Sequence, residues 1–120
     1  MSNLGLKEII KYDKLPTMIT KVVINKNIEI KFNKDVKSGL FNPEVRDLIE
    51  YWITEIEDIG YNEYIKSELF KMLNDHSLKN ERDGQHSITV DQTGGRLIYS
   101  VVKNAIVLKV IKIISDHDYS

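Results

Sequence analysis

The sequence has no cysteine among its 120 residues, and it has only two prolines and six glycines. The lack of cysteine excludes disulfide bonds and thiolate metal sites, and it favours an intracellular protein. The longest apolar stretch, residues 105–114, is interrupted by Lys109 and Lys112 and falls well short of the roughly 20 residues that cross a membrane. Charged residues also interrupt the N-terminus, so no signal peptide is expected. The length and these absences predict one cytoplasmic domain without a membrane segment.

The sequence also has little net charge, −1, but its charges are unevenly distributed. Residues 1–41 contain eight lysines and four acidic residues, residues 42–83 contain five basic and eleven acidic residues, and residues 84–120 contain four basic and three acidic residues. The middle segment could face a basic partner or form an ordinary solvated surface, and the flanking segments could form a positive face. Charge alone therefore does not show whether either surface binds a partner.

The N-terminal region has the pattern of a β-strand or a β-hairpin. Residues 22–24 are β-branched, and residues 28–32 alternate between apolar and charged side chains. A period of two predicts one buried face, formed by Ile28, Ile30 and Phe32. The asparagines at residues 25–27 fit a hairpin turn between the two runs, although one bent strand explains the pattern equally well.

Two helices are expected in the middle of the chain. Asn42, Pro43 and Glu44 have the features of a helix start, which are a capping side chain, a proline in the first turn and an acidic residue near the positive end of the dipole. Apolar residues then recur at spacings of three and four on one buried face: Val45, Leu48, Ile49, Trp52, Ile53 and Ile56. Gly60 ends this helix, and Asn62 is expected to cap a second one, with an apolar side formed by Ile65, Leu69, Met72 and Leu73. Trp52 is therefore expected to be a core residue.

The C-terminal third predicts three strands. Residues 86–91 alternate in polarity, and residues 96–102 and 105–114 are rich in β-branched side chains. The connections at residues 93–95 and 103–104 are so short that the three strands must form an antiparallel meander. A block of helices between strands indicates an α+β fold, with the helices packed on one face of the sheet.

This order of elements resembles the RelE/ParE toxin superfamily, and four short stretches resemble its motifs. The stretches are residues 27–36 (NIEIKFNKDV), residues 76–79 (HSLK) followed by Gly84 and Ser87, residues 96–101 (RLIYSV) and residues 116–119 (DHDY). In order, they are similar to the family's opening strand, the entry to its second strand, its arginine-led strand and the His/Tyr terminus of its YoeB-like branch. The resemblance covers residues 27–120 and implies that residues 1–26 are an N-terminal extension within a single domain, 1–120.

The resemblance implies a toxin of a toxin-antitoxin system that acts as an mRNA interferase. Such an endoribonuclease cleaves mRNA on the ribosome, inhibits translation and is restrained by an antitoxin protein; a homodimer is left open. In this chemistry the 2′-hydroxyl attacks the adjacent phosphate, which requires a base, an acid and cations. No cofactor is implied, and the three histidines do not have the spacing of a zinc site.

The resemblance assigns roles to residues of the C-terminal half. Arg96 would hold the scissile phosphate, and His117 would be the general acid. The general base would be His76 or Asp75, with His76 preferred. Three further residues would complete the site. Arg82 and His86 would add a phosphate contact or replace the base. Tyr119 would stack on a nucleobase.

An alternative function follows from the charge distribution. A non-catalytic module that binds a protein, such as an immunity or antitoxin-like protein on a related fold, would use the acidic segment 42–83 to shield a basic partner. The two functions differ in whether Arg96, His117 and one candidate base converge on one face. The candidate bases are Asp75, His76 and His86.

Overall fold

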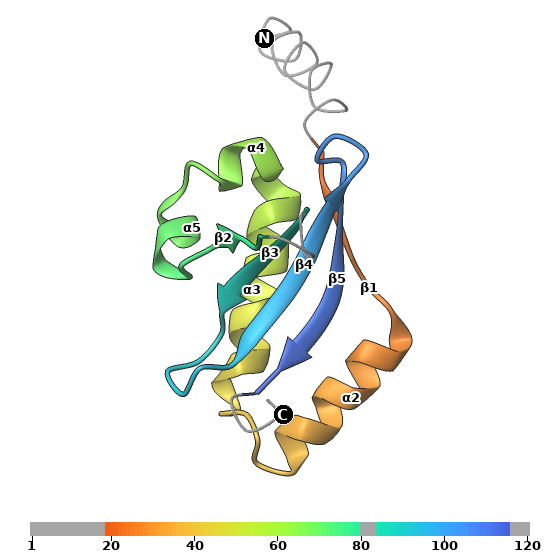
Figure 1. Cartoon of the computed structure of the whole chain (residues 1–120), viewed down its shortest axis with the longest axis vertical. Coiled ribbons are helices and arrows are strands. Elements are labelled where there is room, and N and C mark those ends of the chain that lie inside the picture. The colour runs from red at the N-terminus through yellow and green to blue at the C-terminus, as the bar shows by residue number, and fades with distance from the viewer. Residues whose placement is uncertain (1–18, 80–83, 116–120) are drawn as a thin grey trace, which may run out of the picture.

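The computed structural model describes residues 19–79 and 84–115, which form an α+β fold with helices on one face of a five-stranded sheet (Figure 1). The elements are β1 (Lys21–Ile24), α2 (Lys26–Lys37), α3 (Glu44–Ile59), α4 (Tyr61–Tyr64), α5 (Glu68–Met72), β2 (His76–Ser77), β3 (Gln85–Thr89), β4 (Arg96–Val102) and β5 (Val107–Ile114). The strand order across the sheet is β1-β5-β4-β3-β2. The predicted α+β class is confirmed, whereas the number and order of the strands differ from the prediction.

The predicted strand over residues 28–32 is wrong, because these residues belong to α2. The side chain of Asn25 accepts a hydrogen bond from the amide of Ile28 at 2.9 Å, so it caps this helix and does not form a hairpin turn. Phe32 is buried, with Ile28 and Val36 packed beside the core, whereas Ile30 is 53% exposed. The alternation of residues 28–32 suggested a strand, but the apolar residues 28, 32 and 36 are four positions apart. This spacing places them on one face of a helix.

The opening strand of the sheet is β1, which lies within the segment expected to be an extension. It pairs in parallel with β5, and Val22 lies opposite Leu108. The amide of Val22 donates a hydrogen bond to the carboxylate of Glu57 at 2.9 Å, which ties this edge strand to α3. Residues 27–36 therefore follow the opening strand, and residues 1–18 lie outside the described part of the chain.

The second predicted helix is divided into α4 and α5, each a short helix. Ser67 separates them, because its side chain accepts a hydrogen bond from the amide of Phe70 at 3.3 Å and starts a new helix. Asn62 is not a cap, since Gly60 precedes the first residue of α4. Leu69 and Leu73 are buried as predicted, whereas two of the expected core residues are exposed, Met72 by 76% and Ile65 by 41%.

The predicted C-terminal meander is confirmed. Strand β3 pairs with β4, and β4 pairs with β5, in antiparallel orientation. The turn expected at residues 103–104 extends over residues 103–106, because β5 begins at Val107 and not at Ala105; Lys103, Asn104 and Ala105 have positive φ values of 55°, 57° and 73°. Strand β2 was not predicted, because two residues are too few to show a periodic pattern.

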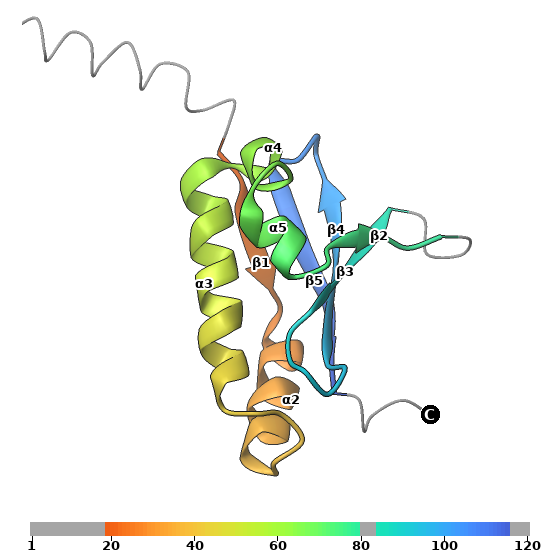
Figure 2. The same ribbon diagram turned by 90° about the vertical axis from the view of Figure 1, so that its left-hand side faces the viewer.

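The core lies between α3 and the sheet, which lie side by side in Figure 2. Trp52 is fully buried at its centre, as predicted, with its ring 5.3 Å from that of Tyr99 in β4. None of the helices within residues 19–79 and 84–115 is long and apolar enough to cross a membrane.

Candidate functional site

The sheet separates the candidate residues into two groups, because residues opposite one another on neighbouring strands point to the same face. His86 lies opposite Tyr99, whose side chain is buried against the helices. His76 lies opposite Ser87, one residue from His86 along β3 and therefore on the other face. Arg96 lies opposite Thr89, two residues from Ser87 and so on the same face as His76. His76 and Arg96 thus share the face that α3 does not cover, which we call the open face.

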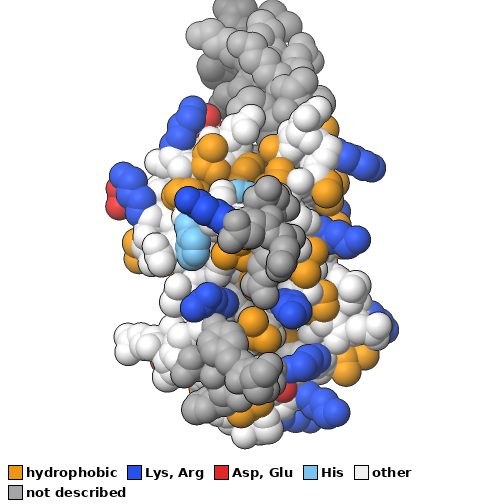
Figure 3. All heavy atoms as spheres, in the orientation of Figure 1, with side chains coloured by type: hydrophobic (Ala, Val, Ile, Leu, Met, Phe, Trp, Pro, Cys, Tyr) orange, Lys and Arg blue, Asp and Glu red, His pale blue; other side chains and the backbone are white. Residues whose placement is uncertain are grey.

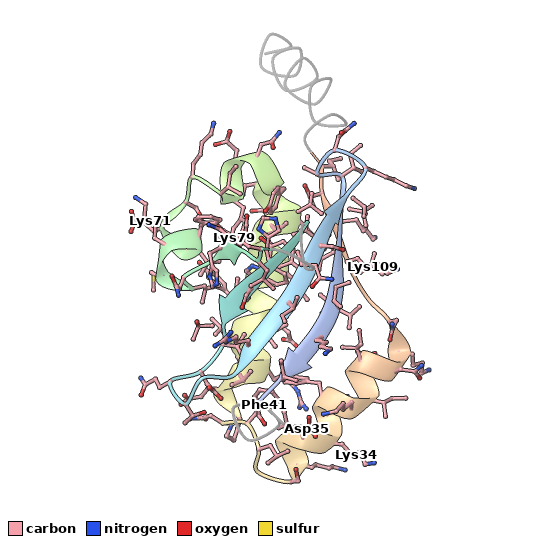
Figure 4. All side chains as sticks on the ribbon, in the orientation of Figure 1. Lys34, Asp35, Phe41, Lys71, Lys79 and Lys109 are labelled. Carbon is pink, nitrogen blue, oxygen red and sulfur yellow. The ribbon has the colours of Figure 1, made fainter. Side chains whose placement is uncertain are left out.

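Lysines extend this open face along β5. Lys109 lies opposite Ser100, and Lys112 lies opposite Ile98, two positions of β4 that alternate with the core residues Leu97 and Tyr99. Without an irregularity, residues three apart on a strand would point to opposite faces; the β-bulge between these pairs places both lysines on one face. Both are exposed, and Lys109 extends from β5 in Figure 4.

The open face is electropositive although the chain is nearly neutral overall. The described strands contain lysine, arginine and histidine but no aspartate or glutamate. Helix α3 carries six acidic residues, Glu44, Asp47, Glu50, Glu55, Glu57 and Asp58, on the opposite side of the sheet. Figure 3 shows lysine and arginine side chains distributed over the open face. Among the described residues, acidic side chains are therefore absent from the strands, whereas basic side chains lie on both the strands and the helices; a sheet without carboxylates suits an anionic ligand.

His76 is exposed on this face with a defined orientation. Its Nδ1 lies 2.8 Å from the backbone oxygen of Asn74. A carbonyl oxygen only accepts hydrogen bonds, so Nδ1 donates, and in the neutral ring the lone pair is on Nε2. Asn74 has a φ of 53°, a left-handed conformation that turns the chain out of α5. The ring is therefore set in the tautomer that a general base needs.

His76 and Arg96 lie on one face of the sheet. They are two strands and two residues apart, which places their Cα atoms roughly 12 Å from each other. Ser87 and Ile98, which lie between them on this face, are buried. A phosphate near His76 would need the long guanidinium side chain of Arg96 to reach it as a planar donor.

Asp75 lies on the other side of the sheet, in the core. Its side chain is completely buried, and its Oδ2 accepts hydrogen bonds from the hydroxyls of Tyr64 at 2.6 Å and Tyr99 at 2.7 Å. The indole of Trp52 donates to the hydroxyl of Tyr64 at 3.0 Å. The second carboxylate oxygen of Asp75 has no hydrogen-bond partner in the described part of the chain.

His86 lies next to this cluster and is partly exposed. Its ring stacks on Tyr99 with centroids 5.1 Å apart, and its Nδ1 is 3.9 Å from the Oδ1 of Asp75. Burial raises the pKa of Asp75, despite the two tyrosine hydrogen bonds that oppose the shift. Burial also lowers the pKa of His86, and the nearby Asp75 only partly offsets this shift. Both neutral forms are therefore favoured by the core.

The lowered pKa of His86 predicts a pH dependence of stability. A histidine whose pKa is below its ordinary 6.5 in the folded chain stabilises the fold above that pH, and this contribution is lost as the pH falls through the lowered pKa. From about pH 7 to about pH 5, the wild type should lose stability relative to His86→Phe, which keeps a ring on Tyr99 but cannot bind a proton. Urea unfolding at both pH values measures this difference, and parallel curves for the two proteins would contradict it.

The structure thus places two of the predicted site residues, His76 and Arg96, on the same face of the sheet, and Asp75 and His86 on the other face. The remaining three, Arg82, His117 and Tyr119, lie outside the described residues. Sequence reasoning missed Lys109 and Lys112, although their interruption of an apolar strand was a visible signal. Within the described ranges, no group of histidine and acidic side chains could hold a metal ion.

Comparison with known proteins supports the fold. No family model and no curated protein matches the sequence. Among solved structures, a YoeB/ParE toxin from Agrobacterium tumefaciens matches with a TM-score of 0.57 and 15% identity over 80% of this chain and 98% of its own. A copper-bound mutant toxin from Helicobacter pylori matches with a TM-score of 0.54 and 18% identity over 85% and 100%. The conserved hypothetical protein HP0894 from Helicobacter pylori gives 0.53 and 17% over 83% and 98%.

Proposed function

Because the chain has a RelE/ParE-like toxin fold, we propose that it is a cytoplasmic toxin of a toxin-antitoxin system that cleaves mRNA without a metal ion. The observation that carries this proposal is the placement of His76 and Arg96 on one electropositive face. A fold alone does not establish an activity, so the proposal depends on these side chains. By analogy with the fold, mRNA on the ribosome is the proposed substrate, and an antitoxin is the proposed partner.

The proposed reaction is an intramolecular transfer at phosphorus. The Nε2 of His76 takes the proton of a ribose 2′-hydroxyl, and the 2′-oxygen forms a bond to the adjacent phosphorus. Arg96 donates two N–H groups to the phosphate oxygens and stabilises their developing charge. The bond from phosphorus to the 5′-oxygen breaks, and that oxygen takes a proton from the general acid. The products are a 2′,3′-cyclic phosphate and a 5′-hydroxyl.

We assign the remaining roles by position. His117 is the proposed general acid, with Arg82 and Tyr119 as proposed RNA contacts; all three lie outside the described residues. Lys109 and Lys112 lie beside β4 on the open face and would bind the flanking phosphates. Their contribution should weaken as salt is added, because phosphate contacts release counterions.

Asp75 and His86 are not proposed to contact the RNA. The side chain of Asp75 is completely buried, and that of His86 stacks against Tyr99 on the helical side of the sheet. Their expected catalytic role is therefore replaced by a structural one.

Alanine at Arg96 should weaken mRNA cleavage at limiting RNA by roughly 10- to 100-fold, because hydrogen bonds to charged groups contribute about 1.5–3 kcal/mol. Cleavage of a defined message in a translation extract measures this loss. Lys103→Ala is the matched control, since it removes one positive charge from the exposed turn at the far end of β4. Equal losses in both variants would show a general charge effect and contradict the role of Arg96.

A second candidate function is favoured by α3. Its exposed surface is strongly acidic and carries Tyr51, which is 56% exposed, a combination that suits a basic protein partner. In that case, the chain would bind a partner without cutting RNA. Wild-type protein that is soluble and abundant in a bacterial host, with normal growth and intact mRNA, would favour this function over the ribonuclease.

A further inference from the structure

Strand β2 is too short to hold His76 in place by its own ladder. It has two residues, His76 and Ser77, which lie opposite Ser87 and His86. After the strand, the amide of Leu78 donates to the backbone oxygen of Gln85 at 2.8 Å. A two-residue strand at the edge of a sheet needs further support on its N-terminal side, where Asp75 lies.

Asp75 supplies that support through three hydrogen bonds. Its amide donates to the backbone oxygen of Phe70 at 3.1 Å. Its carboxylate accepts from the hydroxyls of Tyr64 and Tyr99, at 2.6 and 2.7 Å. The residue just before His76 is therefore fixed to α5, α4 and β4 at once.

The direction of each hydrogen bond in this network is set. Each tyrosine hydroxyl has one proton, and both Tyr64 and Tyr99 use it on Asp75. The hydroxyl of Tyr64 consequently accepts from the indole of Trp52, and the hydroxyl of Tyr99 accepts from that of Tyr61, each at 3.0 Å. A buried network in which the direction of every hydrogen bond is fixed is stiff, because a rearrangement leaves a buried polar group unpaired.

This anchor is next to the contact that orients the imidazole. The Nδ1 of His76 bonds to the carbonyl of Asn74, which joins the buried Asp75 directly. We propose that Asp75 is a positioning residue: it holds the Asn74 carbonyl so that His76 keeps its proton on Nδ1 and presents Nε2 to the open face. The catalytic part of this inference rests on the proposed role of His76 as the base.

The loss of the Asp75 side chain should slow the chemical step and leave RNA binding unchanged. Arg96, Lys109 and Lys112 lie on strands other than β2, and none of the three takes part in the hydrogen bonds of Asp75. A misplaced catalytic group lowers the rate steeply even when the substrate is bound, so Asp75→Ala, which removes the acceptor of both tyrosine hydroxyls, should lower the rate at saturating RNA by roughly 10- to 100-fold. The RNA affinity should stay within about twofold.

A double-mutant cycle tests whether Asp75 acts through His76. Single-turnover cleavage is measured for the wild type, Asp75→Ala, His76→Ala and the double variant. Asp75→Ala should slow the wild type but change the rate of His76→Ala by less than about twofold. An equal effect in both backgrounds would overturn the positioning role. If His76→Ala cleaves as fast as the wild type, the proposed function fails, and the tautomer measurement below decides the positioning role separately.

Nitrogen NMR of the labelled imidazole tests the inference without any activity. Wild-type His76 should be protonated mainly on Nδ1, and Asp75→Ala should reduce this preference. Tyr99→Phe keeps the ring and the carboxylate, removes one donor and serves if Asp75→Ala folds poorly; its preference should lie between the two. The same tautomer in all three proteins would overturn the inference.

Discussion

Replacement of Trp52 by alanine should lower the free energy of unfolding by about 3–5 kcal/mol. The side chain is fully buried and packs between Tyr99 in β4 and Tyr64 in α4, with ring centroids 5.3 and 6.4 Å away. Its loss leaves a cavity and also removes the indole donor from the hydroxyl of Tyr64. Because a domain of this size is stable by only about 5–15 kcal/mol, the variant should be close to unfolding.

Urea unfolding followed by circular dichroism measures this loss. Tyr51→Ala is the matched control, because Tyr51 is the preceding residue of the same helix and is 56% exposed. Its stability should change by no more than about 0.5 kcal/mol. Similar losses at the two positions would contradict the location of the core between α3 and the sheet.

Replacement of His76 by alanine should lower the single-turnover rate of RNA cleavage by roughly 10²- to 10⁴-fold, the range that a general base contributes. The side chain is exposed, so the fold should be retained, and the RNA affinity should change little because the cations lie on β4 and β5. Arg96→Ala should lower both the RNA affinity and the single-turnover rate, because the guanidinium is proposed to bind the phosphate and to stabilise the charge that develops on it.

Ser77→Ala is the matched control for His76. Ser77 is the other residue of β2 and lies opposite His86, which places its side chain toward the helical face. This variant should cleave RNA at close to the wild-type rate. A His76→Ala variant that remains as fast as the control would contradict the assignment of the base.

Local sequence patterns predicted the C-terminal meander, whereas pairing between distant residues could not be predicted from such patterns. Lys103 and Asn104 mark a tight turn by residue type alone, and the strands on either side have period-two or β-branched patterns. The parallel pairing of β1 with β5 joins residues more than 80 positions apart, and no local pattern reports it. In α2, the alternation of five residues agreed with a strand, and only the spacing of Ile28, Phe32 and Val36 distinguishes the helix.

Two of the candidate residues that a motif predicted lie on one face of the sheet. His76 and Arg96 were predicted from their resemblance to family motifs, and the register places both on the open face. Asp75 and His76 point to opposite faces because side chains alternate along the chain at β2. The sequence did not predict this two-residue strand, so it could not show which of the two residues is buried. Lys109 and Lys112 are three residues apart, so the sequence implies opposite faces unless the β-bulge is known.

The charge distribution was informative in part. The acidic segment 42–83 includes α3, and its acidic residues lie on the helical side of the sheet. The overall charge of −1 gave no indication of an electropositive face, because the described strands carry basic residues and no acidic ones, whereas the helices carry both. An RNA-binding surface is thus compatible with a nearly neutral chain.

The chemistry of the cut RNA ends tests the proposed reaction most directly. After induction of the wild type in a bacterial host, mRNA fragments should carry 2′,3′-cyclic phosphates and 5′-hydroxyls, and induction of His76→Ala should give none of these new ends. Fragments with 3′-hydroxyls and 5′-phosphates, or intact mRNA in cells that contain abundant soluble wild-type protein, would contradict attack by the 2′-hydroxyl on this face.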